Sequence, residues 1–295
     1  MKPTQISLFQ SFQNTKKTPK PFIKWAGGKS HLLEQFTPLF PKQFNNYFEP
    51  FTGSAAVFFY LYTLRETGTI SFKNVRLTDL NDELILVYKT VRDNIDELLI
   101  LLTSHRQSHN KEYYYHVRSV KLDALSDTER AARFIYLNKT CFNGLYRVNR
   151  SGQFNVPMGS YKNPQIFNES ELRSASESLS GVDLAVANYA DVLLHAKSGD
   201  FIYFDPPYLP ISKTSYFTGY TKFPFAEKEQ HELKDVFQQL DKMGCKVMLS
   251  NSWADLILNL YRDYNLVEVK ASRAINSDAE KRGKISELVV LNYDK

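Results

Sequence analysis

Residues 205–208, Asp-Pro-Pro-Tyr, carry groups that could perform chemistry, and they follow an apolar run. Residues 201–204, Phe-Ile-Tyr-Phe, are all apolar or aromatic, as in a strand that is buried on both faces. Asp205, Pro206, Pro207 and Tyr208 follow, and the prolines end the strand because proline donates no ladder hydrogen bond. The sequence therefore predicts a carboxylate and an aromatic ring at a strand's carboxyl end, where open α/β sheets bind ligands.

This tetrapeptide suits methyl transfer to an exocyclic amine, a poor nucleophile because its lone pair is delocalised into the ring. Asp205 and the Pro206 carbonyl can each accept one N–H, which favours a tetrahedral nitrogen with a localised lone pair. Pro206 and Pro207 hold these acceptors in place, and Tyr208 offers a face on which an extruded base can stack. The structural alternative is a buried strand with a Pro-Pro turn and a solvated aspartate.

Two other predicted strand ends carry groups that could hold a nucleoside. A short strand runs into a small-residue turn at Gly53, and an amphipathic helix follows over residues 55–66. Residues 75–79 form a second predicted strand, and its last residue, Asp79, suits ribose hydroxyls. Asp79 could equally belong to a helix start, because residues 81–83 open a helical pattern that extends to about residue 102.

The glycine-rich segment at residues 21–30 is a further candidate for ligand contact. It ends in Gly-Gly-Lys-Ser, like a phosphate-binding P-loop, but that motif requires glycine where Ile23 stands. The P-loop interpretation therefore fails. The paired glycines still allow close backbone approach, with the Trp25 indole before them and the Lys29 ammonium after.

The alternation of strands and helices predicts an α/β fold with an insertion. The alternation lapses between about residues 104 and 168, where Asn-Gly and Ser-Gly pairs indicate turns or a hairpin. We therefore predict a flexible basic arm at 1–20, a discontinuous catalytic domain at 21–82 and 170–295, and an inserted, mainly helical substrate-recognition domain at 83–169.

Charge favours a nucleic-acid partner. The net charge is +5, and the segment from residue 130 to residue 162 contains no Asp or Glu. Its six basic residues are Arg130, Arg133, Lys139, Arg147, Arg150 and Lys162. A solvated surface is the ordinary explanation for such a run, but the missing counter-charge favours contacts to phosphates.

Several classes of protein are disfavoured by composition. No apolar run approaches the ~18 residues of a membrane span, and the N-terminus lacks the apolar region of a signal peptide. Cys141 and Cys245 stand far apart without metal-type spacing, which disfavours a disulfide scaffold and a metal site. We expect a cytoplasmic location; in a bacterial-type cell, DNA as the partner would associate the protein with the nucleoid.

Five blocks, in this order, resemble Dam-type DNA adenine-N6 methyltransferases, and especially the modification methylases of GATC-specific restriction systems. The blocks are FIKWAGGK at 22–29, FEPF-x-G at 48–53, NGLYRVN at 143–149, FNVP-x-G-x-YKNP at 154–164 and DPPY at 205–208. The resemblance implies a Rossmann-like, S-adenosylmethionine-dependent sheet with an inserted target-recognition domain. It also implies transfer to a flipped adenine of double-stranded DNA, with GATC as the site. Whether a cognate restriction endonuclease acts on the same site stays open, no direct contact with one is implied, and the oligomeric state is not fixed.

The resemblance also implies roles for single residues. Those implied for S-adenosylmethionine are Trp25, Lys29 at its carboxylate, Gly53 in the glycine-rich loop, Asp79 at the ribose, Tyr189 in the adenosine pocket, and Asp205 beside the methyl donor. Those implied for DNA are Lys24 and Arg147 at guanines, Leu145 and Pro157 at thymine methyl groups, and Phe142 and Asn143 in the space of the extruded adenine.

The chain departs from this pattern at one turn. Ser54 and Ala55 stand where many relatives keep further glycines, so we expect the cofactor pocket to survive with altered affinity. Two rival functions are a methyltransferase of the same fold acting on RNA or a protein amide, and a DNA-binding module with a vestigial fold.

Overall fold

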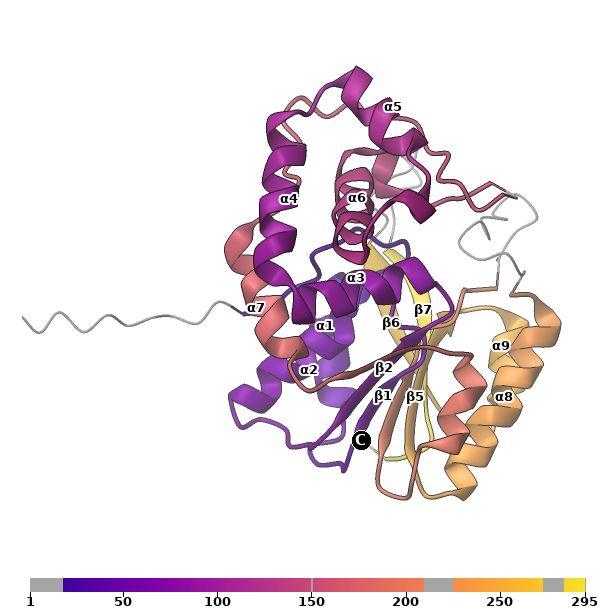
Figure 1. The fold of residues 1–295 in the computed structure, drawn as a ribbon. Helices are drawn as coiled ribbons and strands as arrows, with labels where there is room; N and C mark the ends of the chain where they lie inside the picture. The colour runs from indigo at the N-terminus through magenta and orange to yellow at the C-terminus, as the bar shows by residue number, and fades with distance from the viewer. Residues whose placement is uncertain (1–17, 150, 210–224, 273–283, 295) are drawn as a thin grey trace, which may run out of the picture.

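A seven-stranded sheet forms the centre of the protein, whose computed structural model describes residues 18–149, 151–209, 225–272 and 284–294 (Figure 1). The spatial order is β3-β2-β1-β4-β5-β7-β6. The strands are β1 (Tyr47–Glu49), β2 (Val75–Asp79), β3 (Asp183–Val186), β4 (Phe201–Phe204), β5 (Lys246–Ser252), β6 (Asn265–Ser272) and β7 (Lys284–Leu291). The first five are parallel, whereas β7 is antiparallel to both β5 and β6. The strand order reverses between β1 and β4, which makes their carboxyl ends the expected ligand crevice.

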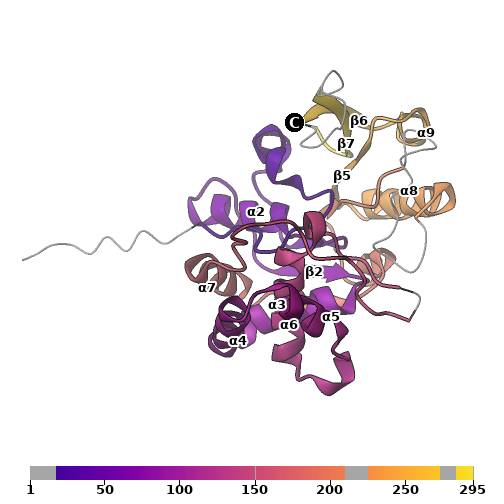
Figure 2. The same cartoon turned by 90° about the horizontal axis from the view of Figure 1, so that it is seen from above.

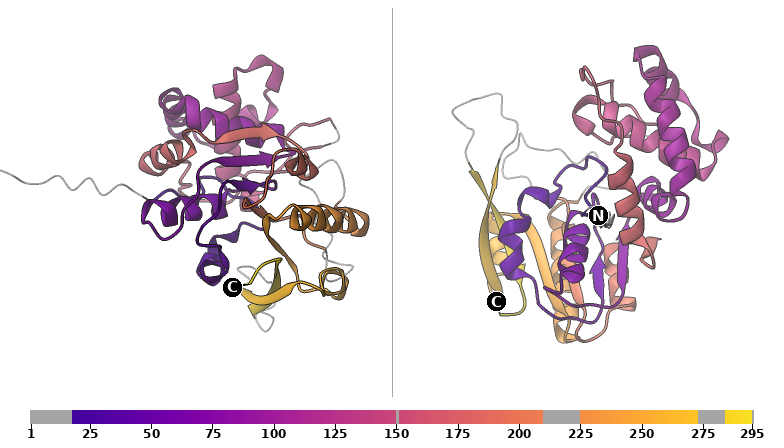
Figure 3. Two further views of the ribbon diagram at one scale, coloured as in Figure 1. Left: turned by 90° about the horizontal axis from the view of Figure 1, so that it is seen from below. Right: turned by 90° about the vertical axis from the view of Figure 1, so that its left-hand side faces the viewer.

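Helices cover both faces of this sheet, which confirms the predicted α/β class (Figures 2 and 3). The α-helices are α1 (Leu33–Phe36), α2 (Ala56–Glu66), α3 (Asp82–Asp93), α4 (Ile95–Gln107), α5 (Lys111–Ser119), α6 (Asp127–Thr140), α7 (Glu169–Leu179), α8 (Glu227–Lys242) and α9 (Asp255–Leu260). Phe201 and Tyr203 of β4 pack in the core with α2, α3 and α7. Ile202 and Phe204 point to the opposite core with α8 and α9, so β4 is buried on both faces, as predicted. Within the described ranges, no helix has the length and apolar character needed to cross a membrane.

The inserted segment is mainly helical, as expected, and α4, α5 and α6 stand together beyond α3 at one end of the molecule (Figure 1). Helix α3 contacts β2 and β3 as well as α6 and α7, so it joins the sheet to the inserted helices. The predicted domain boundary after residue 82 coincides with the start of α3. Our division into domains stays a prediction. Of the predicted arm at 1–20, residues 1–17 lie outside the described part of the chain.

One helix prediction is wrong in its length. The pattern that opens at residues 81–83 gives two helices, because Asn94 leaves the helical conformation with φ −133° and ψ 40°. The Asn94 N–H still closes α3 on the Thr90 carbonyl, and its own carbonyl accepts the Leu98 N–H of α4. Asparagine is tolerated at such breaks because it does not favour helix interiors.

The expected hairpin-like loop is present over residues 147–149 and 151–155. The Asn149 N–H donates to the Gln153 carbonyl, and the Asn155 N–H donates to the Arg147 carbonyl. Val148 and Phe154 form an isolated antiparallel bridge between the two arms. The buried Phe154 ring anchors this loop on Tyr146, with ring centres 5.8 Å apart.

Candidate active site

Asp205 lies immediately after β4, at the strand end where the strand order predicts ligand binding. The Lys29 ammonium contacts both of its carboxylate oxygens, at 2.7 and 2.8 Å. The Ser250 hydroxyl, from β5, donates a third hydrogen bond at 3.1 Å. Burial raises the pKa of Asp205 above its ordinary value, and Lys29 opposes this rise. The site thus contains a desolvated carboxylate held by a cation.

Lys29 is nearly buried, with 4% of its side chain exposed. Its ammonium also donates to the Gly27 carbonyl at 2.5 Å and lies 4.6 Å from the centre of the Tyr208 ring. The structure therefore places Lys29 between the carboxylate and the ring of the DPPY segment. Lys29 is therefore in direct contact with Asp205, the predicted catalytic carboxylate.

The backbone of the DPPY loop is fixed by buried side chains from α8 and β5. The Gln230 amide donates to the Pro207 carbonyl at 3.1 Å, and the Asn251 amide donates to Gln230 at 2.9 Å. Gln230 and Asn251 are both fully buried. Among the residues that the structure describes, none donates a hydrogen bond to the Pro206 carbonyl. The loop is thus held in place while this acceptor has no protein partner in the described ranges.

Gly53 and Asp79 meet at the carboxyl ends of β1 and β2. One carboxylate oxygen of Asp79 accepts the Gly53 N–H at 3.1 Å, and the other accepts the Asn81 N–H at 3.0 Å. Burial raises the pKa of Asp79, and these backbone N–H groups oppose the rise. Asn81, not Asp79, caps α3, because its side chain accepts the Leu84 N–H. Asp79 therefore fixes the glycine turn, as a ligand-binding loop requires.

The Trp25 indole packs directly on this glycine turn. A Cβ atom at position 53 would lie 2.8 Å from Trp25 Cδ1, and Gly53 has φ +47°, so only glycine fits without strain. Trp25 also stacks on Tyr146 of the insert, with ring centres 5.8 Å apart. Tyr189 is buried and stacks on Phe51, with ring centres 5.3 Å apart.

Glu49, at the end of β1, is a buried acid that our sequence analysis did not single out. It is 2% exposed and accepts hydrogen bonds from the Tyr47 hydroxyl at 2.8 Å and the Phe58 N–H at 3.1 Å. Burial is the main cause that raises its pKa to about 8. The sequence signal that could have identified Glu49 was its place in the FEPF block, four residues before Gly53.

The predicted DNA-contacting residues gather on a second surface, although Lys24 is distant from the others in sequence. Asn138 binds the Lys24 backbone on both sides, accepting from its N–H and donating to its carbonyl, each at 2.7 Å. The Lys24 stem crosses Gly144, where a Cβ atom would come within 2.3 Å of it. The Lys24 ammonium donates to the Tyr161 hydroxyl at 3.0 Å, and our sequence analysis gave Tyr161 no role.

Arg147 and the predicted wedge residues belong to the same segment as Gly144, which the Lys24 side chain contacts. The Arg147 Nε donates to Asn155 across the hairpin-like loop at 2.7 Å, and its terminal nitrogens have no partner within the described ranges. Phe142 is 49% exposed, and Asn143 adopts a left-handed conformation with φ +54°. Leu145 is half-buried, and Pro157 is exposed. These side chains together form a surface of basic, apolar and amide groups.

Comparison with known proteins identifies the family. The D12 class N6 adenine-specific DNA methyltransferases match residues 25–275. The chain belongs to this family. It is therefore an enzyme that methylates adenine in DNA, and its sheet and helices fit the corresponding fold.

Relatives match this D12 methyltransferase over nearly its whole length. The Type II methyltransferase M1.LlaDCHI of Lactococcus lactis subsp. cremoris is 42% identical, across 95% of this chain and 98% of the relative. The Type II methyltransferase M.MjaIII of Methanocaldococcus jannaschii is 43% identical, across 93% and 99%. The DNA adenine methylase of Haemophilus influenzae is 31% identical, across 92% and 93%.

The basic run of this methyltransferase is only partly available to phosphates, which corrects our interpretation of it. Arg130 pairs with Glu83 and Asp127, and the buried Arg133 donates to the carbonyls of Val117 and Arg118. Lys139 is half-buried, and burial lowers its pKa to about 8. Arg130 thus joins α6 to α3, and Arg133 joins α6 to the end of α5. Arg147 and Lys162 are exposed, and Arg150 lies outside the described residues.

The backbone conformation of Ala55 has a structural cost. Ala55 is fully buried with φ +53° and ψ 30°, a left-handed conformation that costs a residue with a Cβ atom about 1–2 kcal/mol. Glycine relieves this strain but loses about 0.5–1 kcal/mol of chain entropy. Ala55→Gly should therefore raise the free energy of unfolding by about 0.5–1 kcal/mol, measured by denaturant titration. The matched control is Ala56→Gly in the first turn of α2, which should lower it. Equal losses in both variants would contradict this account of Ala55.

Proposed function

We propose that this enzyme transfers a methyl group from S-adenosylmethionine to N6 of a flipped adenine within GATC in double-stranded DNA. The observation that carries the proposal is the arrangement of two acceptors at one strand end. The Asp205 carboxylate and the Pro206 carbonyl adjoin in a loop that is fixed by buried side chains. An exocyclic amine has two N–H groups, and two fixed acceptors match them.

The residues around the glycine turn fit S-adenosylmethionine. Gly53 lets Trp25 approach the backbone closely, and Asp79 holds the turn while remaining partly exposed at the strand end. Asp79 would bind the ribose hydroxyls, and Tyr189 would line the adenosine pocket. Trp25 would contact the cofactor at the glycine turn, and Lys29 would bind its carboxylate. When bound, the cofactor supplies an electrophilic methyl group on a sulfonium.

Asp205 and the Pro206 carbonyl would orient the target amine. Accepting one N–H each, they favour a tetrahedral nitrogen whose lone pair points away from the ring plane. This interaction strengthens as positive charge develops on the nitrogen, so it stabilises the transition state more than the ground state. Tyr208 would stack on the flipped base.

Lys29 has to release Asp205 before an amine can bind there. In the structure its ammonium contacts both carboxylate oxygens and covers the Tyr208 ring. A carboxylate brought by the methyl donor would compete for this ammonium. Lys29 would then exchange one anionic partner for another, which avoids leaving a buried cation unpaired.

The second surface would read the sequence of the DNA. Lys24 and Arg147 suit the O6 and N7 acceptors of guanine, and Leu145 and Pro157 suit thymine methyl groups. Phe142 and Asn143 would fill the space that the adenine leaves. We propose residues 83–169 as the target-recognition domain, and residues 21–82 and 170–295 as the catalytic domain. A restriction endonuclease acting on the same site is a functional partner that needs no direct contact.

One assay tests the proposal directly. Labelled methyl transfer from S-adenosylmethionine is measured on duplexes that contain GATC and on matched duplexes with single-base changes. We expect N6-methyladenine only in GATC duplexes. Methylation of adenine at a different site would reject the GATC assignment, whereas transfer to RNA or to a protein amide alone would reject DNA as the substrate.

Asp79 should govern cofactor affinity and leave sequence preference unchanged. A hydrogen bond to a charged group contributes about 1.5–3 kcal/mol, so Asp79→Ala should weaken S-adenosylmethionine binding about 10- to 100-fold. Isothermal calorimetry measures the affinity, and methylation of GATC variants measures preference. The control is Asp82→Ala, an exposed acid in the first turn of α3. Unchanged affinity in Asp79→Ala would reduce Asp79 to a support for the turn.

A further inference from the structure

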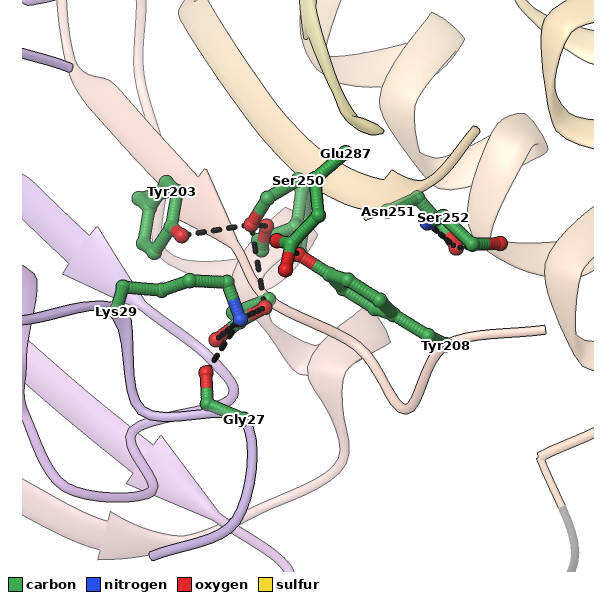
Figure 4. Close-up of polar contacts among 10 residues, drawn as sticks. Gly27, Lys29, Tyr203, Tyr208, Ser250, Asn251, Ser252 and Glu287 are labelled. Carbon is green, nitrogen blue, oxygen red and sulfur yellow. Dashed lines mark hydrogen bonds and ion pairs between the residues drawn. The ribbon is translucent and has the colours of Figure 1, made fainter. Parts of the chain in front are cut away.

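Glu287 reaches the predicted catalytic loop from β7, the strand that runs antiparallel to β5 (Figure 4). It stands opposite Ser252 in the register of the two strands. Its carboxylate accepts a hydrogen bond from the Tyr208 hydroxyl at 2.8 Å. A residue 79 positions along the chain thus binds the aromatic member of the DPPY segment.

The Tyr208 ring needs such a contact to adopt one orientation. Pro206 and Pro207 restrict the backbone on its N-terminal side, but they leave its side-chain torsions free. The Lys29 ammonium lies over the ring at 4.6 Å and contacts the Asp205 carboxylate at the same time. If Lys29 turns to a cofactor carboxylate, the Tyr208 ring loses this contact. Among the described contacts, the hydrogen bond from the Tyr208 hydroxyl to Glu287 then remains.

The supports for the loop divide between backbone and side chain. Gln230 holds the Pro207 carbonyl, and Ser252 donates to the Leu209 carbonyl at 3.0 Å. Both act on the backbone on either side of residue 208. Among the described residues, Glu287 accepts the hydrogen bond from the side chain of Tyr208.

We propose that Glu287 is a positioning residue that fixes the Tyr208 ring against the target base through the Tyr208 hydroxyl. This inference rests on the proposed function, because it assigns Tyr208 the stacking role. A carboxylate suits the task, since a hydrogen bond to an ionised acceptor is about twice as strong as a neutral one. Glu287 itself need not touch cofactor or DNA.

Three single variants, together with the double variant Tyr208→Phe with Glu287→Ala, separate this role from simple structural support. Tyr208→Phe removes the hydroxyl and keeps the ring, Glu287→Ala removes the acceptor, and Glu287→Gln keeps an acceptor without charge. Glu268→Ala is the matched control, because Glu268 is an exposed acid on the adjacent strand that pairs with Lys270. Single-turnover methylation and S-adenosylmethionine affinity are measured for each.

We expect Glu287→Ala and Tyr208→Phe each to slow single-turnover methylation about 10- to 100-fold, with cofactor affinity unchanged. Glu287→Gln should recover most of the rate, and Glu268→Ala should match the parent. The double variant Tyr208→Phe with Glu287→Ala should be no slower than either single variant, because both remove one interaction.

A second readout does not depend on turnover. A duplex with 2-aminopurine in place of the target adenine reports stacking of the extruded base by its fluorescence. The parent should quench this base on Tyr208, and both Glu287→Ala and Tyr208→Phe should give a less quenched, more mobile signal at saturating enzyme.

The outcomes distinguish the inference from the function on which it rests. If the parent methylates no adenine in DNA, the proposed function fails, and the role of Glu287 falls with it. If the parent is active and Glu287→Ala equals it, or if the two single effects multiply in the double variant, only the positioning role is overturned. If Glu287→Ala lowers the melting temperature sharply, the Tyr208→Phe rate and fluorescence still decide the matter.

Discussion

Replacing Asp205 with alanine is expected to slow methyl transfer about 10²–10³-fold, in a protein that is less stable but still folds and binds duplex DNA. Asp205 would accept an N–H of the target amine most strongly when that nitrogen becomes tetrahedral and cationic. Loss of one fixed electrostatic partner of a transition state typically costs about 10²–10³ in rate. We expect a loss within this range, because Asp205 is one of the two acceptors proposed for the target amine.

The variant has a second consequence that its controls must separate. Asp205→Ala leaves the Lys29 ammonium without its carboxylate partner in a site where it is almost buried, which destabilises the fold. Asp205→Asn keeps the volume and one carbonyl acceptor, so it should fold better and retain part of the rate. Circular dichroism and duplex binding check the fold, and a single-turnover assay measures the chemistry. Near-normal transfer by Asp205→Ala would disprove the mechanism.

The positions of the strand-end groups followed from local sequence pattern. The apolar run at 201–204 predicted a strand buried on both faces, and the prolines after it predicted where that strand stops. Gly53 and Asp79, 26 residues apart, were predicted at two strand ends, and the structure joins them by one hydrogen bond. Parallel strands bring such ends together, so periodicity was sufficient for this part of the site.

The supports behind those groups could not be predicted in the same way. Gln230 sits in an ordinary amphipathic helix, and Glu287 sits next to Ser286 at the polar end of a strand whose residues 288–291 are all apolar. Nothing local distinguishes them from neighbouring polar residues. Their contacts with Pro207 and Tyr208 arise from the placement of α8 and β7 beside β5, which is a property of the tertiary fold.

Charge composition was informative about the partner and misleading about single residues. A run of basic residues without acids in its own segment indicated phosphate contacts, yet Arg130 finds Glu83, which lies outside that segment. Arg133 instead donates to two backbone carbonyls. Counter-charge can come from a distant part of the chain, so local charge balance does not report exposure. Arg147 and Lys162 are exposed, and this difference makes them useful for a direct test.

Replacing Arg147 with alanine is expected to change which sequences are methylated more than it changes affinity for DNA. A bidentate contact from arginine to guanine contributes about 1–3 kcal/mol of discrimination, which corresponds to roughly 10- to 100-fold in rate. The bond from Arg147 Nε to Asn155 fixes the guanidinium on the hairpin-like loop, and the terminal nitrogens remain for a base edge. Arg147→Ala should therefore methylate GATC far more slowly and relax preference at one base pair.

Lys162→Ala is the matched comparison, because Lys162 is an exposed cation of the same segment with no predicted base contact. A phosphate contact adds affinity without sequence information, so this variant should weaken all duplexes alike and reduce the salt slope by about one. Arg150→Ala should behave likewise, although Arg150 lies outside the described residues. Methylation of GATC and its single-base variants is compared for each protein at two salt concentrations. If Arg147→Ala loses affinity uniformly and shows the same reduced slope, Arg147 contacts the phosphate backbone and base readout has to be assigned to another residue.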